Sequence, residues 1–182
     1  MSLSRRHLLA AVGATGAAAL FTEPVTADAA TVFKVLSANH TGITVVNIEH
    51  SLKFWRDILG FPVVVRGEAA GKAGEDITGV PGADLEFAIL SIPGGHAVEL
   101  VQYRAPADRQ HLRPLPDDVG SVHLALNVDD IRAVLRRARK AGWRAPGKPV
   151  TWNQAGSPFN GYSFVYMTDP DGTYVELIQA PM

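Results

Sequence analysis

The sequence of 182 residues has no cysteine, almost no net charge and no long apolar run. The absence of cysteine excludes disulfide scaffolds, thiolate metal sites, cysteine nucleophiles and lipid attachment through cysteine. The formal net charge of -1 argues against a nucleic-acid-binding protein, because such proteins are typically basic. The hydrophobic content of 47% is too high for a disordered chain. Any metal ion must therefore be bound by His, Asp, Glu or backbone oxygen.

The N-terminal residues 1–29 predict an export signal rather than part of the folded domain. Arg5 and Arg6 precede an apolar stretch, rich in Ala and Gly, from Leu8 to Phe21, and small residues follow before Ala30. This order is typical of a signal peptide, and the paired arginines indicate the twin-arginine type. The apolar stretch is too short for a stable membrane span. We therefore expect a protein exported to the periplasm or the extracellular space, with a single mature domain over residues 30–182 and no membrane span.

The mature part of the chain repeats itself, which indicates an internal duplication. Two gap-free alignments relate the halves: residues 40–48 align with 123–131, and residues 87–99 align with 164–176. The first alignment pairs Asn47 with Asp130. The second, continued for three more residues, pairs Gln102 with Gln179. We infer two modules, near residues 37–104 and 120–181.

Each module follows the order strand, helix, then two or three strands. Apolar residues at helical spacing predict helices over 51–59 and 131–138, with Asp130 as an N-cap and Gly142 as a C-terminal stop. Alternating or continuous apolar residues predict the strands, which cover 63–65, 85–92, 97–103, 121–128, 161–167 and 173–179. Two stretches rich in Gly and Pro, 67–83 and 146–160, are expected to be loops.

Strand alternation places one His and one Glu of each module on the side of the sheet away from the helix. In residues 121–128 the apolar side chains share one face, which leaves His123 on the other. Glu99 and Glu176 each stand between two apolar neighbours in the last strand of their module. If the two sheets curve toward each other, we expect His40, Glu99, His123 and Glu176 to meet in one cleft.

Two imidazoles and two carboxylates form a suitable ligand set for a divalent ion such as Ni, Zn, Co, Mn or Fe. Taken singly, a His or Glu in such a position is usually a structural or solvent-facing residue. The duplication distinguishes these four, because the remaining histidines have no His counterpart in the other module: His7, His50, His96 and His111. We therefore predict one divalent metal ion per site, formed within one chain or across a homodimer; the sequence leaves both arrangements open.

Five segments resemble the vicinal oxygen chelate superfamily, the group of glyoxalases, bleomycin-resistance proteins and extradiol dioxygenases. They read HTGITV from His40, SLKFWRDILGF from Ser51, VELVQY from Val98, HLALNVDDI from His123 and DPDGTYVEL from Asp169. The resemblance is nearest to the glyoxalase I-like, methylmalonyl-CoA epimerase-like and ValD-like branches. It implies an α+β fold of two tandem βαβββ modules that form a cupped, mixed or antiparallel sheet with the helices on the outside.

By position, the two His and two Glu match the four metal positions of the glyoxalase I-like and epimerase-like branches. The resemblance thus implies a lyase, epimerase or isomerase that moves a proton beside a metal-bound carbonyl through an enediolate. Glu176 is the first candidate for the catalytic base, since the matching glutamate of glyoxalase I acts as one, and Glu99 is the symmetric candidate. The predicted loop offers further candidates for a base in Glu68, Glu75 and Asp76, although solvated surface charges are the more usual role for such residues.

The expected substrate is a small molecule with adjacent oxygen atoms. Glutathione and coenzyme A substrates are mainly cytoplasmic, so the predicted export argues against both. Two departures from the family pattern are Glu99, where the methylmalonyl-CoA epimerase typically has Gln, and Asn47, where an Asp often follows the first strand.

Two alternatives remain at this point. An Fe(II) extradiol-type dioxygenase would generally use two His and one carboxylate, and Glu99 stands where the second His would be expected. A metal-free binding protein of the bleomycin-resistance type generally lacks the ligand set, which this chain has. Four aromatic residues are candidates for lining a binding pocket: Trp55, Phe87, Trp152 and Tyr162.

Overall fold

The chain folds into two modules with similar element orders, as the duplication predicts. The computed structural model describes residues 33–181, so the predicted export signal lies outside the described residues. Module one contains β1 (His40–Thr44), α1 (Ile48–Trp55), β2 (Val63–Ala70), α2 (Gly71–Thr78), β3 (Asp84–Ser91) and β4 (Ala97–Ala105). Module two contains β5 (His123–Asn127), α3 (Ile131–Ala138), the 3-10 turn η2 (Arg139–Ala141), β6 (Val150–Thr151), β7 (Ser163–Thr168) and β8 (Tyr174–Gln179).

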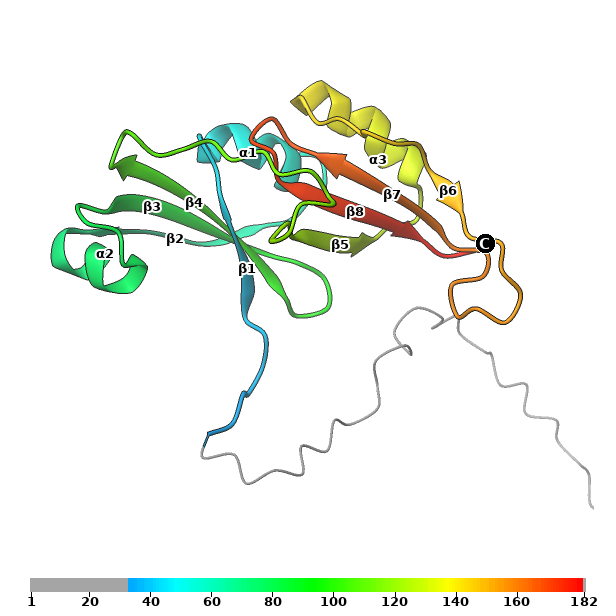
Figure 1. Ribbon diagram of the computed structural model, residues 1–182, viewed down its shortest axis with the longest axis horizontal. Coiled ribbons are helices and arrows are strands. Elements are labelled where there is room, and N and C mark those ends of the chain that lie inside the picture. The colour runs from blue at the N-terminus through cyan, green and yellow to red at the C-terminus, as the bar shows by residue number, and fades with distance from the viewer. Residues whose placement is uncertain (1–32, 182) are drawn as a thin grey trace, which may run out of the picture. The chain divides into compact units, whose positions relative to one another are not determined.

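Each module forms its own four-stranded mixed sheet (Figure 1). The strand orders are β1-β4-β3-β2 and β5-β8-β7-β6, and in both sheets the first strand of the module runs parallel to the last. The α+β class with tandem modules is therefore confirmed. In the described part of the chain, strand hydrogen bonds do not join the two sheets into one continuous cup.

Helices α1 and α3 begin at equivalent N-caps. The side chain of Asn47 accepts a hydrogen bond from the backbone N–H of His50 at 2.8 Å, and Asp130 accepts one from Ala133 at 2.9 Å. Asn47 therefore has the helix-capping role of its aligned residue Asp130, and α1 starts at Ile48, before the predicted start. Among residues 33–181, no helix has the length and apolar character needed to cross a membrane.

Two aligned glutamines support the same helices from the last strands. Oε1 of Gln102 accepts a hydrogen bond from the backbone N–H of Ile48 at 2.8 Å, and Oε1 of Gln179 accepts one from Ile131 at 3.0 Å. Each glutamine thus satisfies an N–H group that has no partner inside the helix. The equivalence of these bonds extends the duplication from the sequence to single atoms.

We expect Asn47→Ala and Asp130→Ala each to lower the free energy of unfolding by about 1 kcal/mol, because each removes one capping bond. Chemical denaturation at neutral pH measures both values. Asp129→Ala is the control, since Asp129 is exposed beside the cap, and it should change stability by less than about 0.5 kcal/mol. A similar loss in all three variants would show that the helix caps are not the cause.

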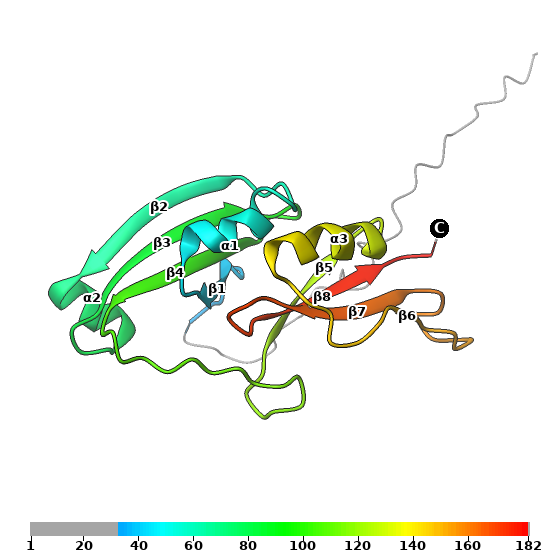
Figure 2. The same cartoon turned by 90° about the horizontal axis from the view of Figure 1, so that it is seen from above.

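The core joins the two helices through aromatic side chains. Phe54 is fully buried and stacks on Trp143 with 3.8 Å between ring centroids, and Trp55 meets Trp143 edge-on at 6.0 Å. Figure 2 shows α1 and α3 side by side, each on its own sheet. Trp55 therefore packs in the core and does not line a pocket, because the helical spacing with Leu52 turns it toward the sheet.

The prediction of a loop over 67–83 is wrong for residues 67–78. Strand β2 continues to Ala70 and is followed directly by α2, which ends at Gly79 with φ of 69°. A Cβ added at Gly74 would lie 2.7 Å from the carbonyl oxygen of Ala83, so this helix packs through close backbone approach. Such packing does not need an apolar stripe, and the sequence pattern therefore missed the helix. The segment 146–160 is a loop as predicted, apart from the short β6.

Candidate functional site: two half-sites on separate sheets

One His and one Glu lie together on one face of each sheet, the open face, which is opposite α1 in module one and opposite α3 in module two. We call His40 with Glu99 half-site one, and His123 with Glu176 half-site two. Nε2 of His40 lies 3.2 Å from Oε2 of Glu99, and Nε2 of His123 lies 3.5 Å from Oε2 of Glu176. The parallel pairing of the first and last strand of each module brings the two side chains of a pair together.

The alternation predicted for the two last strands is present. In β4 the neighbours Val98 and Leu100 are fully buried, whereas the side chain of Glu99 keeps 21% of its surface exposed. Glu176 in β8 keeps 20% of its side-chain surface exposed between two fully buried residues. Both carboxylates are therefore fixed by their strands and still accessible to a ligand.

In the described part of the chain, the two half-sites do not meet. Among residues 33–181, no group of three or more His, Asp or Glu side chains is close enough to hold a metal ion. The expected cleft with all four side chains is thus absent from the described chain, and each sheet presents only half of the predicted ligands. The physical reason is that the modules contact each other through α1 and the segment of η2 and Trp143, with Phe54 on Trp143, rather than through their open faces.

The donor atoms of each half-site fit a divalent ion. Two ligand atoms on adjacent coordination positions, each about 2.1 Å from an ion, lie about 3 Å apart. The separations of 3.2 and 3.5 Å in the half-sites are close to that value. Nδ1 of His40 is 2.8 Å from the side-chain oxygen of Asn39, which fits a histidine that donates from Nδ1 and offers the lone pair of Nε2 to a metal.

Tyr166 distinguishes half-site two from half-site one, and the sequence reasoning missed it. Its ring meets His123 edge-on with 4.9 Å between centroids, and it stands in register opposite Glu176. Burial, and secondly the carboxylate of Glu176, raise the pKa of Tyr166 above its ordinary value. The residue opposite Glu99 is Ile89, and the alignment of the two modules pairs Ile89 with Tyr166. The change from Ile in one module to Tyr in the other, at aligned positions, could have pointed to Tyr166 from the sequence.

The three acidic residues considered as a separate base have local partners. Glu68 pairs with Arg104 at 3.0 Å, and Asp76 pairs with Lys72 one helical turn away. Oε1 of Glu75 accepts a hydrogen bond from the backbone N–H of Gly82. These contacts are those of structural surface residues.

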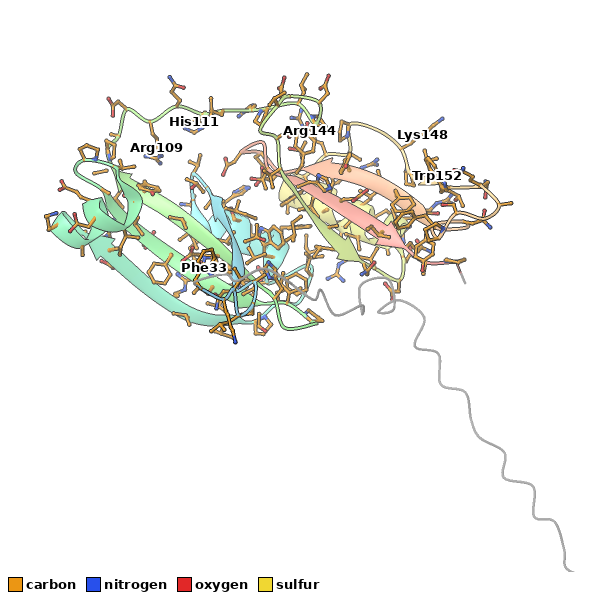
Figure 3. All side chains as sticks on the ribbon, turned by 60° about the horizontal axis from the view of Figure 1, so that its bottom comes forward. Phe33, Arg109, His111, Arg144, Lys148 and Trp152 are labelled. Carbon is orange, nitrogen blue, oxygen red and sulfur yellow. The ribbon has the colours of Figure 1, made fainter. Side chains whose placement is uncertain are left out.

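A cavity lies beside half-site two, and we call it the aromatic pocket. It is lined by Val150, Trp152, Phe159, Phe164 and Glu176. Figure 3 shows Trp152 where the chain leaves β6. Tyr162 stacks on Phe164 with 6.4 Å between ring centroids. Two of the four predicted aromatic residues, Trp152 and Tyr162, thus lie at this pocket or directly beside it.

The fourth aromatic residue, Phe87, belongs to module one. Its ring lies over Gly67 of β2, where an added Cβ would approach the ring to 2.5 Å. Phe87 is aligned with Phe164 in the duplication, but in module one the neighbouring strand β2 runs beneath the ring of Phe87.

Comparisons with known proteins agree with this arrangement. Residues 37–177 match the family model described as the Glyoxalase/Bleomycin resistance protein/Dioxygenase superfamily. A 2-epi-5-epi-valiolone epimerase from Actinomyces sp. is 30% identical over 154 residues, which cover 80% of this chain and 80% of that protein.

Two solved structures are similar in fold. A glyoxalase family protein from Bacillus cereus has a TM-score of 0.73 at 20% identity, covering 85% of this chain and 100% of its own. The trypanothione-dependent glyoxalase I of Leishmania major has a TM-score of 0.50 at 22% identity, covering 79% of this chain and 86% of its own.

Proposed function

Because the chain belongs to the glyoxalase, bleomycin resistance protein and dioxygenase superfamily, we propose that it is a metal-dependent lyase or isomerase that moves a proton beside a carbonyl group. The observation that supports this proposal is the pair of equivalent half-sites, each with a His and a Glu whose donor atoms are adjacent. The names of similar proteins, an epimerase and a glyoxalase I, belong to the same kind of chemistry.

The proposed cofactor is one divalent ion per site, Ni, Zn, Co, Mn or Fe, held by His40, Glu99, His123 and Glu176. When bound, such an ion polarises a substrate carbonyl and lowers the pKa of the neighbouring C–H group. The four side chains supply two neutral nitrogen donors and two carboxylates, which offset the charge of a divalent ion.

We propose that the complete site forms between two copies of the chain. Each copy presents two half-sites that do not meet within its described residues. A twofold dimer that places half-site one against half-site two of its partner makes two identical sites, because the relation is reciprocal. The substrate would then lie between the open faces of two sheets from different copies.

The two glutamates have separate roles in this scheme. Glu176 takes the proton from the substrate carbon with a carboxylate oxygen, and the strand on each side of it holds that oxygen in position. An isomerase returns the proton from the same carboxylate to the neighbouring carbon. An epimerase needs delivery from the opposite side, where Glu99 of the facing half-site is available.

The test combines metal analysis with hydrogen exchange. Protein matured in its native host should contain one ion per chain and exchange the C–H of a small α-hydroxy ketone in D2O, and chelation should abolish the exchange. His111→Ala is the control, because His111 is an exposed residue outside both half-sites. Purified protein without metal, or oxygen consumption with catechols in place of exchange, would contradict the proposal.

A further inference from the structure

We propose that the aromatic pocket binds an aryl or branched alkyl group of the substrate, attached beside the oxygen atoms that react. This inference rests on the proposed function, and it specifies the substrate class of the same site. The cavity measures about 380 Å³, within the range of small-molecule sites. Its wall combines four apolar side chains with the carboxylate of Glu176, so an apolar group in it lies next to the proposed base.

The apolar side chains of the pocket are unusually exposed. Val150 keeps 54% of its surface exposed, Trp152 48% and Phe159 41%. Side chains of this size gain free energy when apolar surface is removed from water, and several of them gathered at one place typically mark a binding site. An apolar substituent of the substrate would cover this surface.

The pocket is held in shape before any ligand binds. The backbone N–H of Trp152 donates to the carbonyl of Tyr162 at 2.7 Å, and Gly161 donates back to the carbonyl of Trp152 at 2.7 Å. The indole N–H of Trp152 donates to Gln154 at 3.1 Å. Phe159 meets Phe164 edge-on with 5.9 Å between centroids. Such preorganisation lowers the entropy lost when a ligand binds.

The pocket adjoins half-site two, and this position gives the substrate a direction. In module one, β2 runs over eight residues and lies beneath Phe87, whereas its counterpart β6 has two residues. The shorter strand leaves the space beside Phe164 open. A substrate with its apolar group in this space has its α-hydroxy carbonyl unit next to Glu176, with Glu99 on the other side.

Two ketones that share the α-hydroxy carbonyl unit test the pocket: 2-hydroxyacetophenone carries a phenyl group where hydroxyacetone has a methyl group. We expect kcat/KM for C–H exchange to be at least about 10-fold higher for the phenyl compound. Trp152→Ala should reduce this preference about 10-fold, mainly through KM. Ile77→Ala, which truncates an exposed apolar side chain on α2, should leave the preference unchanged.

A second measurement does not depend on metal or turnover. Calorimetry of the metal-free protein should detect binding of 2-hydroxyacetophenone, weakened about 10-fold in Trp152→Ala and unchanged in Ile77→Ala. If exchange fails for both ketones but this binding still depends on Trp152, the pocket is supported and the proposed function is wrong. If both ketones exchange equally well and Trp152→Ala alters neither preference nor binding, the pocket is overturned while the proposed function stands.

A second copy of the chain is the competing occupant of this surface. In that case Trp152→Ala would shift the monomer–dimer equilibrium in sedimentation and leave ketone binding unchanged. This result would overturn the assignment of the pocket to the substrate.

Discussion

Chains that carry His40→Ala and chains that carry His123→Ala are expected to restore each other when combined. Each variant alone should lose its bound metal and at least about 1,000-fold of its activity, because every site lacks one ligand. In a mixed dimer, the intact half-site one of one copy faces the intact half-site two of the other. Random association then makes about a quarter of all sites complete, which metal content and exchange rate should both report.

Co-expression with two different affinity tags produces the mixed dimers for this experiment. The matched control combines wild-type chains with chains that carry both substitutions. For a site shared between copies, about a quarter of sites remain intact, since every mixed dimer is inactive; for a site within one chain, about a half remain. No recovery when His40→Ala and His123→Ala chains are combined, together with a half of the sites intact in the control, would assign the site to a single chain.

The local parts of this site could be predicted because they depend on short-range geometry. Alternation along a strand puts Glu99 and Glu176 opposite their buried neighbours, and the duplication selects His40 and His123 from six histidines. The helix cap at Asp130 follows from the same reasoning. The strand alternation and the helix cap are each determined within a few residues of the sequence, whereas the choice of histidines comes from comparing the two modules.

The relation between the half-sites could not be predicted in this way. It depends on the stacking of Phe54 on Trp143, two residues that are distant in the sequence, and no periodic pattern specifies which faces of two modules will meet. Helix α2 was missed for a related reason, because Gly74 packs by backbone contact rather than by an apolar side chain. The aromatic pocket depends equally on contacts between a loop and a strand.

The asymmetry between the half-sites bears on which glutamate moves the proton. Tyr166 and the aromatic pocket both adjoin Glu176, whereas Ile89 stands opposite Glu99. The duplication alone treats the two glutamates as equivalent. The surroundings of Glu176 therefore favour it as the residue that meets the reacting carbon, with Glu99 as a ligand on the other side.

Glu176→Gln is accordingly expected to lower kcat for C–H exchange by about 100- to 10,000-fold, the usual contribution of a general base. The amide keeps an oxygen donor, so metal content should fall much less than activity. Glu99→Gln is the matched variant, because it makes the same chemical change in the other half-site, and it should lower kcat by only about 10-fold.

Exchange followed by proton NMR separates the possible outcomes of this pair. A large loss in Glu176→Gln alone, with metal retained, fits one carboxylate that removes and returns the proton, as in an isomerase. Equal large losses in both variants would mean that both carboxylates transfer protons, as an epimerase requires for delivery to the opposite face. A larger loss in Glu99→Gln than in Glu176→Gln would contradict the assignment of the base, because the reacting carbon would then lie on the side away from the aromatic pocket.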